Sequence, residues 1–211
     1  ERVPEFMRRA FTMLRSGRPG PVVLGIPNAS ATYDETHDPY ISPKGWRSLP
    51  DPVDVKIAAD ALESSNNPVL FVGEGVLYSE ATEELKAFAE KANLPVVTTL
   101  KAKGAFPENH PLSVGVRGDH VLKYMNDADL IFAVGASISP GRFGHGIPDA
   151  TNKKIIQCNI DEYDINRMYP TTHAVIGDAK ATLQSLVEEL ENGSSEQKDQ
   201  IEKEIASTTD Q

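Results

Sequence analysis

Short apolar runs alternate with helix-length amphipathic segments along most of the chain. The runs are rich in Val and Ile and show no regular polar alternation, which is typical of strands buried on both faces of a sheet. We expect such strands at residues 69–72, 95–99, 112–114, 129–134, 154–160 and 173–176. Because parallel strands need long crossover connections, this order predicts an α/β fold with a doubly wound, six-stranded parallel sheet of Rossmann-like type.

Helices are predicted where apolar residues recur every three or four positions. The first contains Phe6, Ala10 and Leu14, and the Gly and Pro residues of positions 17–21 end it. A short buried strand is expected next, at residues 21–26. Further helices are expected near residues 55–62, 85–92, 120–125, 163–168 and 178–190.

Proline-rich and polar stretches divide the chain into parts. Residues 28–51 lack periodicity and contain several prolines, so we interpret them as a connector between the end of one domain, residues 1–27, and a second domain, residues 52–191. From position 191 onward six acidic and two basic residues predict a polar linker, residues 192–211, toward a further domain. The chain opens with Glu inside a helical pattern, so we expect it to be a piece of a longer protein.

The charge balance and the cysteine count exclude several classes of function. Lys and Arg number 21 against 31 Asp and Glu, a formal net charge of −10, which argues against a nucleic acid partner. No apolar run is long enough to span a membrane and no signal peptide is visible, so we expect no membrane partner and a cytoplasmic location. Cys158 is the single cysteine, which excludes an intramolecular disulfide and a multi-cysteine zinc site. Its place inside a strand predicts a buried, unreactive thiol.

Glycines stand at the ends of several predicted strands. In a doubly wound sheet ligands bind where strands end and helices begin, and glycine lets the backbone approach them closely. Ordinary turns also need small residues, so the pattern leaves a nucleotide site and plain turns equally open. The glycines in question are Gly73, Gly75, Gly115, Gly118, Gly135 and Gly177. The segment 141–146, Gly-Arg-Phe-Gly-His-Gly, fits either a diphosphate-binding loop or a mobile loop.

Familiar catalytic and cofactor motifs are missing. The dinucleotide fingerprint fails because Tyr78 stands at its third glycine, and no acid ends the second strand. The sequence contains neither a P-loop nor a serine nucleophile elbow. The five histidines are far apart and lack zinc-binding spacing, so we predict no catalytic residue and no metal ligand in this chain.

An ordered set of segments resembles a known family, the thiamine-diphosphate enzymes of the acetolactate synthase type. The segments are residues 16–24, 95–104, 114–118, 129–136, 159–161 and 177–179. The resemblance covers residues 1–191 and is strongest to the middle domain. It implies that residues 1–27 end a pyrimidine-binding domain, that residues 52–191 are a central domain of nucleotide-binding type, and that the parent is a 2-keto-acid carboligase or decarboxylase.

The resemblance also implies cofactors and site residues. The parent would use thiamine diphosphate and Mg²⁺ and assemble as a homodimer or homotetramer, and the central domain would hold FAD in a structural role, ADP, or no ligand. The positions that match nucleotide-contacting positions of the family are Arg18, Gly73, Gly75, Thr99, Leu100, Gly115, Arg117, Gly135, Ala136, Asn159, Ile160, Asn166, Asp178 and Ala179. Departures from the family are Ser137 in place of an arginine, and Lys101 and Lys103.

The fragment itself is expected to be inactive. The thiamine-activating glutamate and the magnesium-binding constellation of the family are both missing, because residues 177–179 lack the following glycine and the downstream asparagines. Two alternatives stay open. One is a free-standing nucleotide- or flavin-binding module of electron-transfer type, and the other is a structural domain without a ligand.

Overall fold

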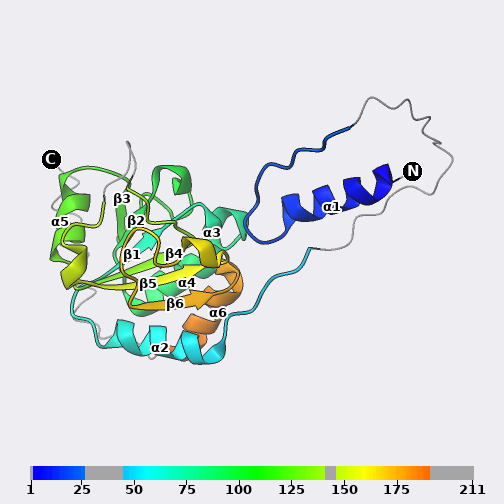
Figure 1. Ribbon diagram of the computed structural model, residues 1–211. Helices are drawn as coiled ribbons and strands as arrows, with labels where there is room; N and C mark the ends of the chain where they lie inside the picture. The colour runs from blue at the N-terminus through cyan, green and yellow to red at the C-terminus, as the bar shows by residue number, and fades with distance from the viewer. Residues whose placement is uncertain (1, 27–44, 141–145, 191–211) are drawn as a thin grey trace. The chain divides into compact units, whose positions relative to one another are not determined.

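The computed structural model describes residues 2–26, 45–140 and 146–190 (Figure 1). The chain separates into two units, Glu1–Arg47 and Ser48–Gln211. The predicted loop at 141–146 falls almost entirely outside the described residues, as do the linker at 192–211 and most of the connector.

The described residues of the first unit contain one helix, α1 (Val3–Arg15), as the apolar spacing predicts. A proline in its first turn and an ion pair between Arg2 and Glu5, with Nη2 and Oε1 2.8 Å apart, support its N-terminus. The buried strand expected at residues 21–26 is wrong, because these residues are irregular and the side chains of Val23 and Ile26 are 92% and 81% exposed. A strand needs a hydrogen-bonded neighbour, and the described part of this unit offers none.

The second unit is built on a six-stranded parallel sheet, which confirms the predicted fold class. Its strands are β1 (Pro68–Val72), β2 (Val96–Thr98), β3 (Ser113–Gly115), β4 (Leu130–Val134), β5 (Lys154–Asn159) and β6 (His173–Ile176). They pair in the order β3-β2-β1-β4-β5-β6, and every pairing is parallel. All six carboxyl ends therefore lie along one edge, and the strand order reverses between β1 and β4.

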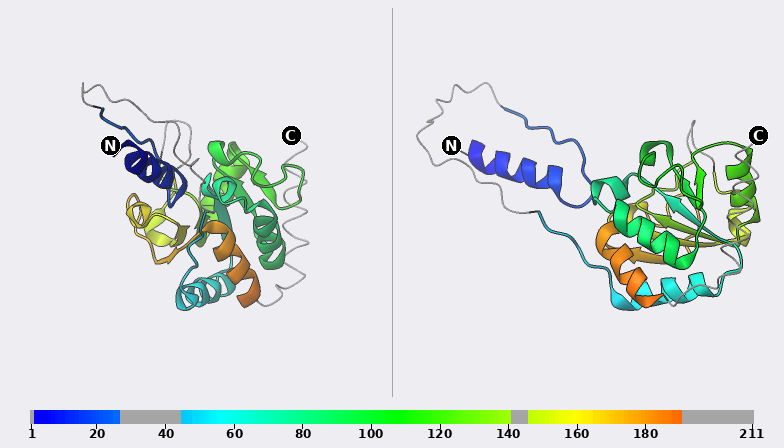
Figure 2. Two further views of the ribbon diagram at one scale, coloured as in Figure 1. Left: turned by 90° about the vertical axis from the view of Figure 1, so that its right-hand side faces the viewer. Right: turned by 180° about the vertical axis from the view of Figure 1, so that it is seen from behind.

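Helices cover both faces of the sheet (Figures 1 and 2). One face is covered by α2 (Pro52–Glu63), α4 (Thr82–Ala92) and α6 (Ala179–Glu189), and the other by α5 (Asp119–Asp127). The even-numbered residues of β4 and β5, such as Phe132 and Ile156, pack under the first group, and odd-numbered ones such as Ile131 pack under α5. The strands are apolar on both sides because both sides are buried.

Short helical turns fill the remaining connections. They are α3 (Gly75–Tyr78) and the 3₁₀ turns η1 (Leu100–Ala102), η2 (Ala150–Asn152) and η3 (Glu162–Asp164). The helix expected near residues 163–168 is wrong, because only η3 forms there. The backbone of Asn166 is left-handed, with φ of 55°, and its amide exchanges hydrogen bonds with Thr171, so the chain turns back instead of coiling further.

The turns that follow β1 and β4 touch backbone to backbone. The N–H of Gly73 donates to the carbonyl of Val134 at 2.9 Å, and the N–H of Gly75 donates to the carbonyl of Gly135 at 3.0 Å. A Cβ on Gly73 would lie 2.1 Å from the Gly135 oxygen, and one on Gly135 would lie 2.8 Å from the Cα of Gly75. Gly135 also has a φ of 60°. We call this contact, where the strand order reverses between β1 and β4, the crossing point of the sheet. It leaves no room for a side chain at Gly73, Gly75 or Gly135.

We predict that Gly73→Ala lowers the free energy of unfolding by about 3 kcal/mol, because the new methyl group overlaps backbone atoms that cannot move apart without breaking the sheet. The control is Gly104→Ala, since Gly104 has a φ of 90° but open space around it. That variant pays only for backbone strain, about 1 kcal/mol. Urea unfolding followed by circular dichroism compares the two, and equal losses would contradict the close contact.

Asp129 fastens the turn between α2 and β1 to the start of β4. Its carboxylate accepts hydrogen bonds from the Ser65 hydroxyl and from the backbone N–H groups of Asn66, at 2.8 Å, and Asn67, at 3.0 Å. Partial burial by itself would raise the pKa of Asp129, but these hydrogen bonds outweigh it and hold the pKa below its ordinary value. The charged form therefore stabilises the fold.

Because the pKa of Asp129 is lower in the folded state, its contribution is complete above about pH 4, the unfolded value, and disappears as the pH falls through the folded value. We expect Asp129→Asn to lower the free energy of unfolding by about 1 kcal/mol at neutral pH. The difference from the unchanged chain should shrink below pH 4 in urea titrations. A difference that stays constant down to pH 2.5 would show that the charge plays no part.

Candidate functional site

The fold brings most of the predicted site residues to the carboxyl edge of the sheet. Each of the six strands ends there in a turn that contains at least one of them. They are Gly73 and Gly75 after β1, Thr99 and Leu100 after β2, Gly115 and Arg117 at and after β3, Gly135 and Ala136 after β4, Asn159 and Ile160 at and after β5, and Asp178 after β6. Asn166 lies in the connection from β5 to β6, whereas Arg18 belongs to the other unit.

The glycines at this edge serve the turns themselves. Gly73, Gly75 and Gly135 are required by their mutual contact. The imidazole of His120 folds over the turn after β3, where a Cβ on Gly118 would lie 2.9 Å from its Cε1 atom, whereas at Gly115 the nearest atom would be 3.7 Å away. The turns after β1 and β4 therefore meet through backbone atoms, and the side chain between Gly73 and Gly75 is that of Glu74.

Asp178 is committed to the interior of the protein. It is 5% exposed and caps α6, accepting hydrogen bonds from the N–H groups of Lys180 at 3.1 Å and Ala181 at 3.3 Å. Its other oxygen accepts the Ser79 hydroxyl at 2.8 Å, and its own N–H donates to the carbonyl of Ser48 at 2.9 Å. A negatively charged group at a helix N-terminus is stabilising, so these contacts give Asp178 a structural role.

The two asparagines also bind neighbouring backbone and side chains. The Asn159 side-chain oxygen accepts the N–H of Asp161 at 3.1 Å, and its amide nitrogen lies 3.5 Å from the carbonyl oxygen of Ala136. Asn166 is engaged with Thr171. These contacts shape the edge between β4 and β6, where Asn159 is buried and Asn166 is exposed.

Several other side chains do project from the edge into solvent. Leu100 is 54% exposed, Tyr163 is 84% exposed, and Arg117 is exposed. Lys101, one of the departures from the family pattern, has its Nζ 3.3 Å from a carboxylate oxygen of Glu74, so this pair bridges the turns after β1 and β2. The edge therefore presents the apolar surface of Leu100 together with the cations Arg117 and Lys101. Of these, Lys101 has the Glu74 carboxylate beside it.

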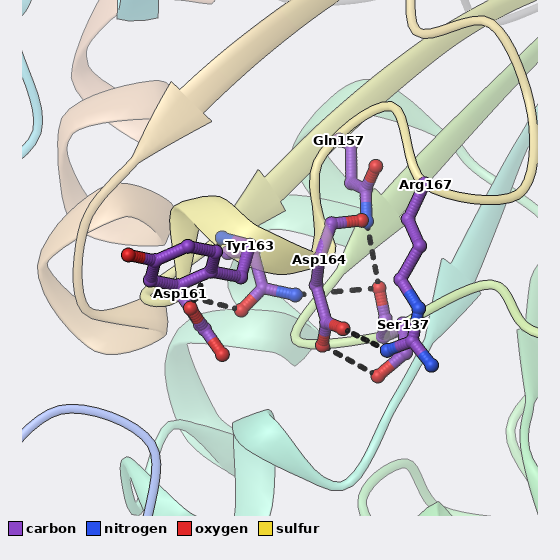
Figure 3. A network of polar contacts seen from close by, with 8 residues as sticks. Ser137, Gln157, Asp161, Tyr163, Asp164 and Arg167 are labelled. Carbon is purple, nitrogen blue, oxygen red and sulfur yellow. Dashed lines mark hydrogen bonds and ion pairs between the residues drawn. The ribbon is translucent and has the colours of Figure 1, made fainter.

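A polar network that sequence reasoning did not find lies between the ends of β4 and β5 (Figure 3). Asp164 is 2% exposed; it accepts the Ser137 hydroxyl at 2.7 Å and an Arg167 N–H at 2.9 Å. The Gln157 amide nitrogen donates to the carbonyls of Asp164, at 3.0 Å, and Ala136, at 3.3 Å. The available signal was Gln157 itself, a polar residue inside an apolar strand, because a buried amide needs partners.

Cys158 is buried, as predicted, and burial raises the pKa of its thiol. It is therefore protonated and unsuited to nucleophilic chemistry. Within residues 2–26, 45–140 and 146–190, no three His, Cys, Asp or Glu side chains gather as metal ligands would. None of the helices in the same ranges has the length and apolar character needed to cross a bilayer.

Comparison with known proteins gives consistent matches. A family model described as "Thiamine pyrophosphate enzyme, central domain" matches residues 55–186. The acetolactate synthase large subunit of Corynebacterium glutamicum is 35% identical over 205 residues, which are 93% of this chain and 33% of the relative. A probable acetolactate synthase large subunit of Methanocaldococcus jannaschii is 35% identical over 201 residues, 90% of this chain and 34% of the relative.

Two solved structures superpose on most of this chain. Benzoylformate decarboxylase from Polynucleobacter necessarius superposes with a TM-score of 0.72 at 25% identity, over 94% of this chain and 38% of that one. A putative thiamin diphosphate-dependent enzyme from Mycobacterium smegmatis gives 0.75 at 24% identity over 92% and 38%, a likeness of fold. The chain spans about a third of the length of the curated relatives it matches.

The commitment of Asp178 to α6 leads to a prediction. Asp178→Ala should lower the free energy of unfolding by about 2 kcal/mol, since it removes a helix cap and leaves the buried Ser79 hydroxyl without this acceptor. Asp51→Ala is the control, because Asp51 caps α2 through a single bond to Val53 and is exposed, so about 1 kcal/mol is expected. Thermal and urea unfolding measure both. An Asp178→Ala protein as stable as the parent would point instead to a ligand-contacting role.

Proposed function

Because the chain belongs to the thiamine pyrophosphate enzymes, as their central domain, we propose that it is the middle part of an acetolactate synthase-like enzyme. Such an enzyme would decarboxylate a 2-keto acid and then join the product to an acceptor or protonate it. The supporting observation is that the family match, residues 55–186, contains all six strands of the sheet. The similar curated proteins are named as acetolactate synthase large subunits or probable ones.

Thiamine diphosphate supplies the chemistry of this class by stabilising the carbanion that decarboxylation leaves behind. The described residues do not fit a site for its magnesium diphosphate. Asp178 is buried and engaged with α6, and the described ranges contain no gathered set of metal ligands. We therefore place thiamine diphosphate and Mg²⁺ on other domains of a longer parent chain, and a homodimer or homotetramer is the proposed assembly.

The role that we propose for this chain is a scaffold with a nucleotide site. The carboxyl edge at the reversal of strand order is where sheets of this topology bind nucleotides. The glycine turns after β1 and β4, the exposed Leu100 and the exposed Arg117 fit a flat, phosphorylated ligand. FAD or ADP is the proposed occupant, with Thr99, Leu100, Gly115 and Arg117 on one side of the crossing point and Ile160 on the other. No step of the reaction is assigned to it.

The nucleotide site is tested by titrating the full chain with FAD and with ADP in a calorimeter. We expect saturable binding of at least one of them at micromolar concentrations. Leu100→Asp should weaken it at least tenfold by replacing apolar surface at the edge with a charged, hydrated side chain, while Val53→Asp, an exposed site on α2, serves as the control. Absence of heat with either nucleotide at high micromolar concentration would leave a ligand-free scaffold.

The activity requires a separate test. The longest open reading frame that contains this chain should release CO₂ from pyruvate or another 2-keto acid when supplied with thiamine diphosphate and Mg²⁺, whereas the 211 residues alone should not. A coupled assay for CO₂ and for the carboligation product measures both proteins. A parent protein that binds thiamine diphosphate but turns over no 2-keto acid would contradict the proposed reaction class.

A further inference from the structure

A buried carboxylate holds an arginine at the edge of the sheet. Asp164 is almost fully buried, and a carboxylate in such a place is stable only with hydrogen bonds and a cation beside it. The Arg167 Nη1 atom lies 2.9 Å from its Oδ1 atom, and the Ser137 hydroxyl donates to Oδ2 at 2.7 Å. The carboxylate thus receives a charged donor on one oxygen and a neutral donor on the other.

Only part of the guanidinium is used in this contact. Arg167 reaches Asp164 through Nη1, whereas a bidentate pair would bring two nitrogens to two oxygens. Its Nε and Nη2 groups meet no acceptor within residues 48–140 and 146–190, and its side chain is 53% exposed. The guanidinium is therefore anchored at one end and presents further N–H donors to solvent at the other.

The surroundings of the arginine are fixed from two strands. Ser137 follows β4 and Asp164 follows β5, and the Gln157 amide nitrogen donates to the backbone on both sides of the gap (Figure 3). Arg167 lies three residues after Asp164 and contacts it, so it stands at the carboxyl ends of β4 and β5. The reversal of strand order, between β1 and β4, is next to them. A cation that is already oriented loses little conformational entropy when it binds a ligand.

The charge of the chain makes this position unusual. With a formal net charge of −10, the protein as a whole does not attract anions, so an anion is held only where a cation is fixed locally. Lys101, on the same edge, has a partner in Glu74 close by. In the described part of the second unit the arginines are Arg117 and Arg167, and Arg167 is the one that a buried network orients.

We propose that Arg167 binds a phosphate group of a nucleoside diphosphate at the carboxyl ends of β4 and β5. The proposal rests on the nucleotide site put forward above and adds a phosphate-binding residue that the sequence pattern did not identify. The planar fork of the guanidinium matches phosphate oxygens, while Asp164 holds the fork in place. Arg167 thereby sets the preference of the edge for a phosphorylated ligand over its parent nucleoside.

The test is calorimetric titration of the full chain with ADP, adenosine and inorganic pyrophosphate. Arg167→Met should weaken ADP and pyrophosphate binding about tenfold or more, the size of a charge-assisted hydrogen bond, and leave adenosine binding unchanged. Arg167→Lys should recover only part of the loss, because an ammonium lacks the fork. Lys56→Met is the control, since it removes one exposed cation from α2, away from the edge.

Arg167→Met leaves Asp164 buried without its cation, so the double variant Asp164→Asn with Arg167→Met carries the test if the single variant does not fold. If the unchanged chain and these variants bind ADP equally, Arg167 has no role in binding, and the nucleotide site stands. Pyrophosphate binding that depends on Arg167, without binding of ADP or FAD, supports the phosphate site and overturns the nucleotide proposal. If the unchanged chain binds none of ADP, FAD, adenosine and pyrophosphate, both proposals are overturned.

Discussion

The contact between the turns after β1 and β4 is the constraint on which the second unit depends. Two chain segments leave neighbouring strands at the point where the strand order reverses, and here they approach until backbone meets backbone. Gly73, Gly75 and Gly135 make this approach feasible, and the hydrogen bonds from Gly73 and Gly75 align β1 with β4. The same contact brings backbone rather than side chains together at the middle of the carboxyl edge, so one feature aligns the strands and shapes that edge.

Buried polar groups join neighbouring elements near the contact between the turns after β1 and β4. Asp178 joins α6 to Ser79, and Gln157 and Asp164 join the ends of β4 and β5. Both carboxylates are buried and each is paired with donors, as burial requires. The groups that remain accessible, among them Leu100 and the outer part of Arg167, are therefore held on a rigid base, which is the arrangement that favours specific binding.

The sheet was predictable from the sequence because strands buried on both faces, such as residues 130–134, can be recognised by their unbroken apolar runs. The strand expected at residues 21–26 failed because an apolar run does not reveal whether a pairing partner exists. The helix near residues 163–168 failed because side-chain contacts of Asp164 and Asn166 override local preference. Most of the predicted site residues share one edge of the sheet, but their own hydrogen bonds, which decide whether they face a ligand, depend on distant chain segments.

The segment before α2 is bound to the turn between β6 and α6. The carbonyl of Ser48 accepts the N–H of Asp178, and a Cβ on Gly177 would lie 3.0 Å from the nitrogen of Pro50. Detachment of α2, which follows this segment, would break the bond between Ser48 and Asp178 beside the start of α6, against which α2 packs. Amide protons in both helices should consequently exchange with solvent in the same opening event, so that elements more than a hundred residues apart in the sequence behave as a single cooperative block.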